Sequence, residues 1–272
     1  MDVAHLAGET CRSGGYPLDN IIMTSRPPDI LWMVDRRYAN SPESRAITTH
    51  AMLSGQAIRY VDYGEEPLFS RGKTAVPVGS VEYVRWVAEP LLGSPLPEIP
   101  DYPEPLRAFC GRRIDRAPLR EAPAGSFVKP TLPKQFDAIR NFDPSKPPSG
   151  VALDTGCWTS EPVRFHEEYR VYVLDREAIG IAQYDLDSPD RGLLPEDTDR
   201  IAKMIAAWED QPVAWALDVG RADGFEDILL VETNDGWATG YYPAAMSAGA
   251  YAEWLLARWR EILSEARRAI EV

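Results

Sequence analysis

The sequence predicts an α/β protein in which a small unit with a parallel sheet precedes a larger α+β part. Three observations predict this class. Short apolar runs alternate with helical stretches over residues 30–88, a stretch with six prolines follows at residues 89–105, and two later strands form a hairpin ahead of a long amphipathic helix. Strands separated by helices are typical of a parallel sheet with crossover connections, whereas a hairpin pairs its strands antiparallel.

The first unit is expected to contain three strands and two helices. Ser41 and Pro42 have the residue types of a helix N-cap and a first helical position, and Gly55 has that of a helix end. Gly79 and Ser80 precede the second helix. The expected elements are strands at residues 30–34, 57–61 and 74–78 and helices at residues 42–54 and 81–88.

Open parallel sheets bind ligands at the carboxyl ends of their strands. Asp35, Arg36, Gly79 and Ser80 follow the first and third expected strands, which makes them candidate site residues. Each of them also fits an ordinary polar loop, and the sequence leaves both interpretations open.

The larger part is expected to contain short strands, one hairpin and two main helices. Tyr251, Trp254 and Trp259 lie on one face of the last helix, a pattern more typical of a core than of a cofactor site. The expected elements are a short helix from residue 106, strands at residues 127–130, 169–174, 214–219 and 228–233, and helices at residues 198–208 and 247–270.

The charge and the cysteines argue against several classes of protein. The net charge is −13 and no basic stripe is visible, which argues against nucleic acid as a partner. No apolar run approaches the roughly 18 residues of a membrane span, and the first residues lack the apolar stretch of a secretory signal. Cys11, Cys110 and Cys157 form no metal motif or disulfide framework. We therefore expect a cytoplasmic protein without membrane partners; its oligomeric state is not indicated.

The segment ILLVETNDG, residues 228–236, ends an apolar strand with a carboxylate and an amide. Side chains alternate along a strand, so Glu232 and Asn234 point the same way. A hairpin with the preceding strand would bring Asp218 close to both. Two carboxylates and an amide oxygen suit Mg²⁺ and leave positions for water and phosphate oxygens. The alternative is a strand that simply ends in a polar turn.

Charged residues upstream of this segment fit the other parts of a nucleotide. Lys129 ends an apolar strand and suits a phosphate group. Glu161 and Glu168 are seven residues apart, and Glu168 shares one strand face with Arg170 and Tyr172. One nucleotide accounts for this mixture, with the lysine on a phosphate and the carboxylates on the metal, the ribose and the adenine.

The order of these blocks resembles the ATP-grasp superfamily of carboxylate–amine ligases. The blocks FVKP, SEPV, EYR, LDVG and VETNDG lie within residues 112–242 and are most similar to a small divergent clade called R-two-K. The segments ILWMVDRR and VGSVEYVR add to the similarity with that clade. The resemblance implies an ATP-grasp fold at residues 96–272 after a small parallel-sheet domain at residues 1–95. It further implies a lid half at about residues 106–165 and a large half at about residues 166–272.

The resemblance also implies ATP and Mg²⁺ as cofactors and a role for each site residue. The implied roles are phosphate binding for Lys129 and Arg113, adenine binding for Glu161 and the backbone of Val163, ribose binding for Glu168, Mg²⁺ binding for Asp218, Glu232 and Asn234, and catalysis by Arg170 and Lys134. Alternatives stay open, because Glu161 and Glu168 could be surface carboxylates and Arg113 a solvated arginine. Arg170 could instead be a structural partner of Asp218 or Glu232.

The implied reaction joins a carboxylate to an amine on an amino acid, a peptide or a protein, through an acyl phosphate. The sequence departs from the family pattern at two places. TLPKQFDAIRNF replaces the usual glycine- and serine-rich loop, and Ala216 replaces an arginine two residues before the metal-binding Asp. These departures keep two alternatives open, namely an ATP-binding regulatory module with weakened turnover and a kinase-like phosphotransferase.

Overall fold

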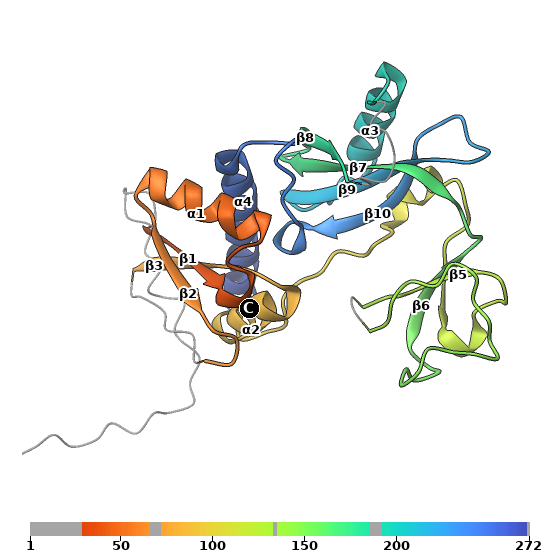
Figure 1. Cartoon of the computed structure of the whole chain (residues 1–272), viewed down its shortest axis with the longest axis horizontal. Helices are drawn as coiled ribbons and strands as arrows, with labels where there is room; N and C mark the ends of the chain where they lie inside the picture. The colour runs from red at the N-terminus through yellow and green to blue at the C-terminus, as the bar shows by residue number, and fades with distance from the viewer. Residues whose placement is uncertain (1–28, 66–71, 133–134, 185–191, 271–272) are drawn as a thin grey trace, which may run out of the picture.

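A computed structural model of the chain describes residues 29–65, 72–132, 135–184 and 192–270 (Figure 1). Its first part is a three-stranded parallel sheet in the order β2-β1-β3. Trp32, Met33 and Val34 of the central strand are completely buried, as expected for a parallel strand that is covered on both faces. The elements are β1 (Asp29–Asp35), α1 (Pro42–Ser54), β2 (Ala57–Val61), β3 (Lys73–Val78) and α2 (Val81–Leu92).

The strands and helices predicted for this unit are confirmed. Ser41 caps α1 by accepting a hydrogen bond from the backbone of residue 44, and Gly55 ends the helix with a φ of 69°. The second helix continues past the predicted end at residue 88 to Leu92, with Pro90 inside it. Leu92 extends the buried face that Ala88 and Val84 form one and two turns earlier.

A second, antiparallel sheet follows the proline-rich stretch, and we call it the lid sheet. Its strand order is β4-β6-β5. The predicted strand β5 is confirmed, whereas β4 and β6 were not predicted because four or five residues without clear alternation give little signal. The predicted short helix is a 3-10 helix. The bounds are η3 (Glu104–Phe109), β4 (Asp115–Pro118), η4 (Leu119–Glu121), β5 (Phe127–Pro130) and β6 (Gly156–Ser160).

A third sheet, here called the large sheet, is antiparallel throughout and has the order β10-β9-β7-β8. The predicted hairpin of β9 and β10 is confirmed. Strand β8 was not predicted, since Gly180 interrupts its pattern; a Cβ there would lie 2.6 Å from the Ala245 carbonyl oxygen. The bounds are β7 (Phe165–Leu174), β8 (Glu177–Gln183), β9 (Ala214–Ala222) and β10 (Leu229–Asp235).

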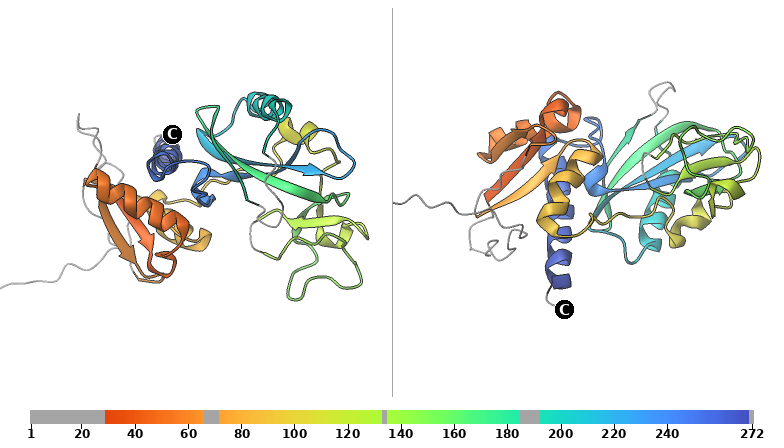
Figure 2. Two further views of the ribbon diagram at one scale, coloured as in Figure 1. Left: turned by 45° about the horizontal axis from the view of Figure 1, so that its top comes forward. Right: turned by 90° about the horizontal axis from the view of Figure 1, so that it is seen from below.

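Helix α3 (Pro195–Ala207) covers one face of the large sheet. Ile201 and Met204 of the helix belong to the same buried cluster as Val171 and Leu217 of the sheet. The lid sheet lies across from the large sheet, as Figure 1 and the left view of Figure 2 show. Lys129 of the lid sheet and Glu232 of the large sheet are in contact.

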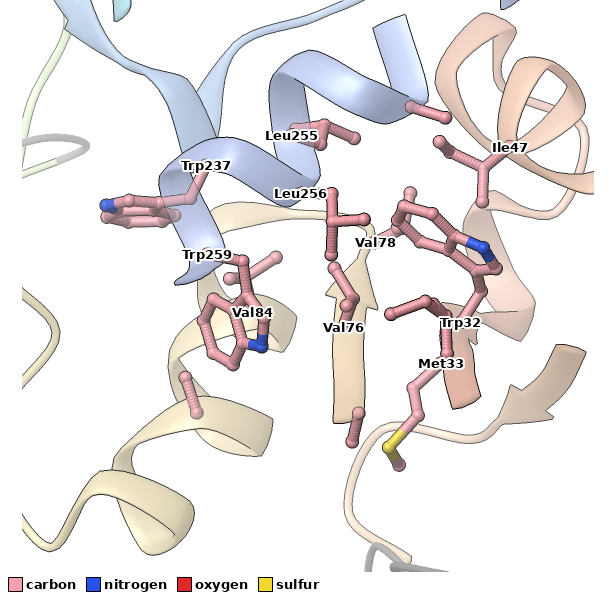
Figure 3. Packing of buried hydrophobic residues seen from close by; sticks show 14 of the residues in the cluster. Trp32, Met33, Ile47, Val76, Val78, Val84, Trp237, Leu255, Leu256 and Trp259 are labelled. Atoms are coloured by element: carbon pink, nitrogen blue, oxygen red, sulfur yellow. The ribbon is translucent and has the colours of Figure 1, made fainter. Parts of the chain in front are cut away.

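Helix α4 (Ala248–Ile270) lies between the N-terminal sheet and the large sheet (Figure 2). Its aromatic face is buried, which confirms the prediction that this face is core. Figure 3 shows Leu256 of α4 beside Val76 and Val78 of β3, close to Trp32 of β1. The C-terminal helix and the N-terminal sheet thus share one hydrophobic cluster, and the division near residue 95 stays a prediction.

The described residues include no helix that is both long enough and apolar enough to cross a membrane.

Candidate active site

The three predicted Mg²⁺ ligands lie together on neighbouring strands of the large sheet. Glu232 of β10 lies opposite Asp218 of β9 in the strand register. The Asn234 amide nitrogen donates to Asp218 Oδ2 at 3.0 Å and to Glu232 Oε1 at 3.3 Å. The hairpin therefore brings together two carboxylates and an amide.

Arg170 of β7 lies opposite Asp218 in the strand register and forms a two-point ion pair with it. Its Nε and Nη2 donate to the two carboxylate oxygens at 2.8 Å and 2.6 Å. The guanidinium also lies 5.4 Å and 5.7 Å from the ring centres of Tyr184 and Tyr242. Arg170 is thus the ion-pair partner of Asp218 that the sequence left open, and its contact with a phosphate stays a prediction.

Lys129 of the lid sheet pairs with two carboxylates, one of which belongs to the large sheet. Its ammonium forms a short ion pair with Glu232 and a second ion pair at 2.8 Å with Asp101. Asp101 belongs to the proline-rich stretch at residues 89–105, in which the sequence predicts no site residue. Its only signal in the sequence was one acidic residue among prolines, IPDYP, and this signal does not place it beside Lys129.

Burial and neighbouring charges change the pKa values of these groups. Burial raises the pKa of Asp218 to about 6, although Arg170 opposes the change. Burial acts on Glu232 in the same sense, but Lys129 and the Asn234 amide outweigh it and lower the pKa of Glu232. Burial would lower the pKa of Lys129, yet the carboxylates of Glu232 and Asp101 raise it. Lys129 and Glu232 therefore hold each other in the charged form.

The residues predicted to bind the nucleoside lie on the strands and loop between the two sheets. Glu168 of β7 accepts a short hydrogen bond from the Tyr184 hydroxyl, and half-buried Val163 lies in the loop before β7. Glu161 and Arg113 line a pocket of about 310 Å³ beside the lid sheet. Arg113 pairs with Asp115 at 2.9 Å and is largely exposed.

The structure thus groups Arg113 with Glu161 and groups Lys129 with the Mg²⁺ candidates. The roles predicted for Arg113, Glu161, Val163 and Glu168 stay predictions. The predicted catalytic residue Lys134 lies outside the described residues.

A second pocket, of about 280 Å³, lies at the carboxyl ends of the N-terminal strands and is bounded by the segment after β10. Gly79 and Ser80 line it, together with Glu43 and Gly240. The Glu43 carboxylate accepts a hydrogen bond from the backbone of Tyr241 at 3.0 Å. Two candidate site residues at these strand ends, Gly79 and Ser80, therefore do border a pocket.

The other two candidates at these strand ends make ion pairs. Asp35 is completely buried and binds Arg37 at 2.9 Å, and Arg36 binds Asp62 at the same distance.

The chemistry of the ligands fits Mg²⁺. Within the described part of the chain, no group of three or more Asp, Glu, His or Cys side chains could hold a metal ion. The candidate set is instead two carboxylates and one amide, and hard cations such as Mg²⁺ prefer oxygen ligands of this kind. Asn234 would have to present its amide oxygen, because its nitrogen faces the carboxylates here.

One sheet that supplies a lysine and a second sheet that supplies the facing carboxylates define a class of protein. This is the arrangement of an ATP-grasp fold. The chain matches the family described as the ATP-grasp domain of the R-two-K clade, family 3, over residues 32–262, and it belongs to that family. The family predicted from the sequence blocks is confirmed.

Solved structures agree on the fold. D-alanine–D-alanine ligase from Bacillus anthracis superposes with a TM-score of 0.57 at 13% sequence identity, covering 87% of this chain and 99% of its own. A RimK domain ATP-grasp protein from Sphaerobacter thermophilus gives a TM-score of 0.53 at 14% identity, covering 84% of this chain and 99% of its own. No curated protein sequence matches this chain significantly. Identities this low establish the fold alone.

Proposed function

We propose that this protein is an ATP- and Mg²⁺-dependent ligase that activates a carboxylate as an acyl phosphate and joins it to an amine. The observation that carries the proposal is the meeting of Lys129, Arg170, Asp218, Glu232 and Asn234 at one place between two sheets. Cations that face paired carboxylates suit a nucleotide triphosphate and its metal. Membership of the ATP-grasp family supports the same conclusion.

Each side chain would have a distinct task in this reaction. Asp218, Glu232 and the Asn234 amide oxygen would hold Mg²⁺, which when bound neutralises charge on the phosphates. Lys129 and Arg170 would donate hydrogen bonds to phosphate oxygens. Because these donors are fixed by strands, they can stabilise charge that develops during phosphoryl transfer without reorganising. In-line transfer depends mainly on such positioning.

The nucleoside would be held farther from the reacting phosphate. We assign the adenine to Glu161 and the backbone of Val163, and the ribose to Glu168, with Arg113 as a further cation. These assignments, together with a lid half at about residues 106–165 and a large half at about residues 166–272, follow the order of the family blocks. Two separate sheets that meet at Lys129 support this division.

The acceptor would be a small molecule or a peptide with a carboxylate or an amine. The pocket beside Gly240 supports this choice, because the segment 240–242 runs from that pocket to Arg170. Tyr172 donates a hydrogen bond to the Gly240 carbonyl at 2.6 Å and accepts one from the Tyr242 backbone at 3.2 Å, and the Tyr242 ring lies against Arg170. An acceptor in that pocket would approach Arg170 along this segment.

The proposal can be tested by trapping the activated carboxylate. The protein would be incubated with ATP, MgCl₂, hydroxylamine and pools of amino acids or short peptides. An acyl phosphate reacts with hydroxylamine to give a hydroxamate, so we expect hydroxamate together with ADP and phosphate. The same mixture with EDTA in place of MgCl₂ is the control and should give neither.

The other outcomes separate the alternatives. A stable phosphorylated product without hydroxamate would show a phosphotransferase. Tight binding of ATP with no ADP release under any of the pools would support a regulatory module, whose support is Ala216 and the missing glycine-rich loop. Failure to bind ATP with MgCl₂ would overturn the proposal.

A further inference from the structure

Asp101 pairs with Lys129 beside the proposed metal ligands, and the proposed reaction gives it no task. Its position is fixed by the backbone of the proline-rich stretch. The Thr233 backbone N–H donates to the Asp101 carbonyl at 2.9 Å, and the Thr233 hydroxyl donates to the Pro100 carbonyl at 2.7 Å. These bonds attach Asp101 to β10 beside Glu232. The backbone of Asp101 is therefore held in place whether or not its carboxylate pairs with Lys129.

Lys129 and Arg170 differ in the number of their carboxylate partners. Arg170 makes its two-point ion pair with Asp218. Lys129 pairs with Glu232 and with Asp101, and the side chains of Lys129 and Asp101 are only 22% and 19% exposed. A largely buried ammonium without a partner is costly. The Asp101 carboxylate is therefore needed whenever the Glu232 carboxylate no longer pairs with Lys129.

Glu232 would coordinate Mg²⁺ when the proposed metal binds. An oxygen that coordinates Mg²⁺ cannot keep its short ion pair with Lys129 unchanged, because two cations would then compete for one carboxylate. Asp101 is attached to the same strand and already contacts the ammonium at 2.8 Å. It can keep that contact while Lys129 turns one of its three donors toward a phosphate oxygen.

We propose that Asp101 is a positioning residue. It retains the Lys129 ammonium beside the proposed phosphate site when the Glu232 carboxylate coordinates Mg²⁺ in place of its ion pair with Lys129. This inference rests on the proposed function, because it needs a nucleotide and a metal at this site. Asp101 also adds negative charge beside the phosphates. It therefore disfavours nucleotide without metal and makes binding depend more strongly on Mg²⁺.

The test is the gain in ADP affinity that Mg²⁺ produces, measured by calorimetry with ADP alone and with ADP plus MgCl₂. Asp101→Asn keeps the shape of the side chain and removes its charge. We expect the Mg²⁺-dependent gain to fall about tenfold, the range of one charge-assisted hydrogen bond. Affinity for ADP without metal should be unchanged or higher, since a repulsive charge has been removed.

Three further variants separate positioning from a structural role. Glu104→Gln removes another carboxylate of the same stretch, one that pairs with Arg107 and is 79% exposed, and it should leave the gain unchanged. Asp101→Glu keeps the charge and should restore much of the gain. In a Lys129→Met background Asp101 has no ammonium to retain, so Asp101→Asn should no longer reduce the gain.

The outcomes are distinct. A parent protein that binds no ADP with MgCl₂ overturns the proposed function and this inference with it. A parent that binds, with a gain unchanged in Asp101→Asn, overturns this inference alone. Equal losses of ADP affinity with and without metal, accompanied by a lower melting temperature, would assign Asp101 a structural role. That result would also overturn the inference that Asp101 positions Lys129.

Discussion

Two arginine–aspartate pairs of nearly the same geometry lie in different surroundings. Arg170 binds Asp218 at 2.8 Å and 2.6 Å, and Arg258 of α4 binds Asp235 at 2.8 Å and 2.7 Å. The side chains of Arg258 and Asp235 are each 4% exposed, and Glu261 of the same helix also binds Arg258. The side chains of Arg170 and Asp218 are 13% and 1% exposed, and the guanidinium lies beside two tyrosine rings.

The comparison teaches that ion-pair geometry does not reveal function. Asn234 and Asp235 are neighbours in the sequence. Asn234 nevertheless contacts the carboxylates of Asp218 and Glu232, whereas Asp235 contacts Arg258 of α4. A pair enclosed beneath a helix can only stabilise the fold. A pair whose arginine is partly exposed, and whose carboxylate adjoins Asn234 and Glu232, can exchange its partner for a ligand. The following variants test this contrast, beginning with the largest expected effect.

Arg258→Met should destabilise the fold most. It leaves the Asp235 carboxylate buried without its main partner, and breaking a buried pair typically costs about 3–5 kcal/mol. Urea unfolding followed by circular dichroism should show this loss of unfolding free energy. Arg260→Met changes an exposed arginine on the same helix and should cost less than about 0.5 kcal/mol. Equal stability of the two variants would show that the Arg258–Asp235 pair does not stabilise the fold.

Glu232→Gln should affect turnover and leave the fold intact. The amide keeps the shape of the side chain and one acceptor oxygen, but it deletes the charge that the metal needs. If about 3 kcal/mol of stabilisation is lost, ATP-dependent activity falls on the order of a hundredfold. The measurement is a Mg²⁺ titration of ADP release, with exposed Glu226→Gln as the matched control. Superimposable titration curves would refute the metal assignment.

Lys129→Ala should weaken ATP binding without unfolding the protein. The variant loses charge-assisted hydrogen bonds to phosphate, each worth about 1.5–3 kcal/mol, so the dissociation constant should rise roughly tenfold or more. Calorimetry measures the affinity and a thermal melt checks the fold. Lys146→Ala, at an exposed site in the same region, should change neither. A large drop in melting temperature with normal affinity would instead identify a structural lysine.

Glu168→Ala should have the smallest effect, because a ribose contact lies far from the reacting phosphate. We expect the Michaelis constant for ATP to rise several-fold, the size of one typical hydrogen bond of about 1 kcal/mol, while the maximal rate stays closer to normal. Exposed Glu177→Ala at the start of β8 is the control. ATP affinity equal to that of the parent would show that Glu168 serves only its contact with Tyr184.

The sequence alone determined the features that depend on local pattern. Helix α1 follows from the cap Ser41 and the end Gly55, and the buried strand β1 follows from one apolar run. The hairpin of β9 and β10 fixed the proximity of Asp218, Glu232 and Asn234, because pairing and alternation along adjacent strands are local rules. The order of short blocks was sufficient to predict the family.

Only the tertiary structure decided which partners these residues have. Asp101 meets Lys129 although 28 positions separate them, and the Arg258 contact of Asp235 depends on where α4 packs. Strands β4 and β6 were likewise not predicted, since they pair with each other across the intervening β5 segment and their own short patterns are weak. The physical reason is the same in each case. Local propensity fixes the direction in which a side chain points along its own element, whereas the burial and charge it meets are set by chain segments brought together only on folding.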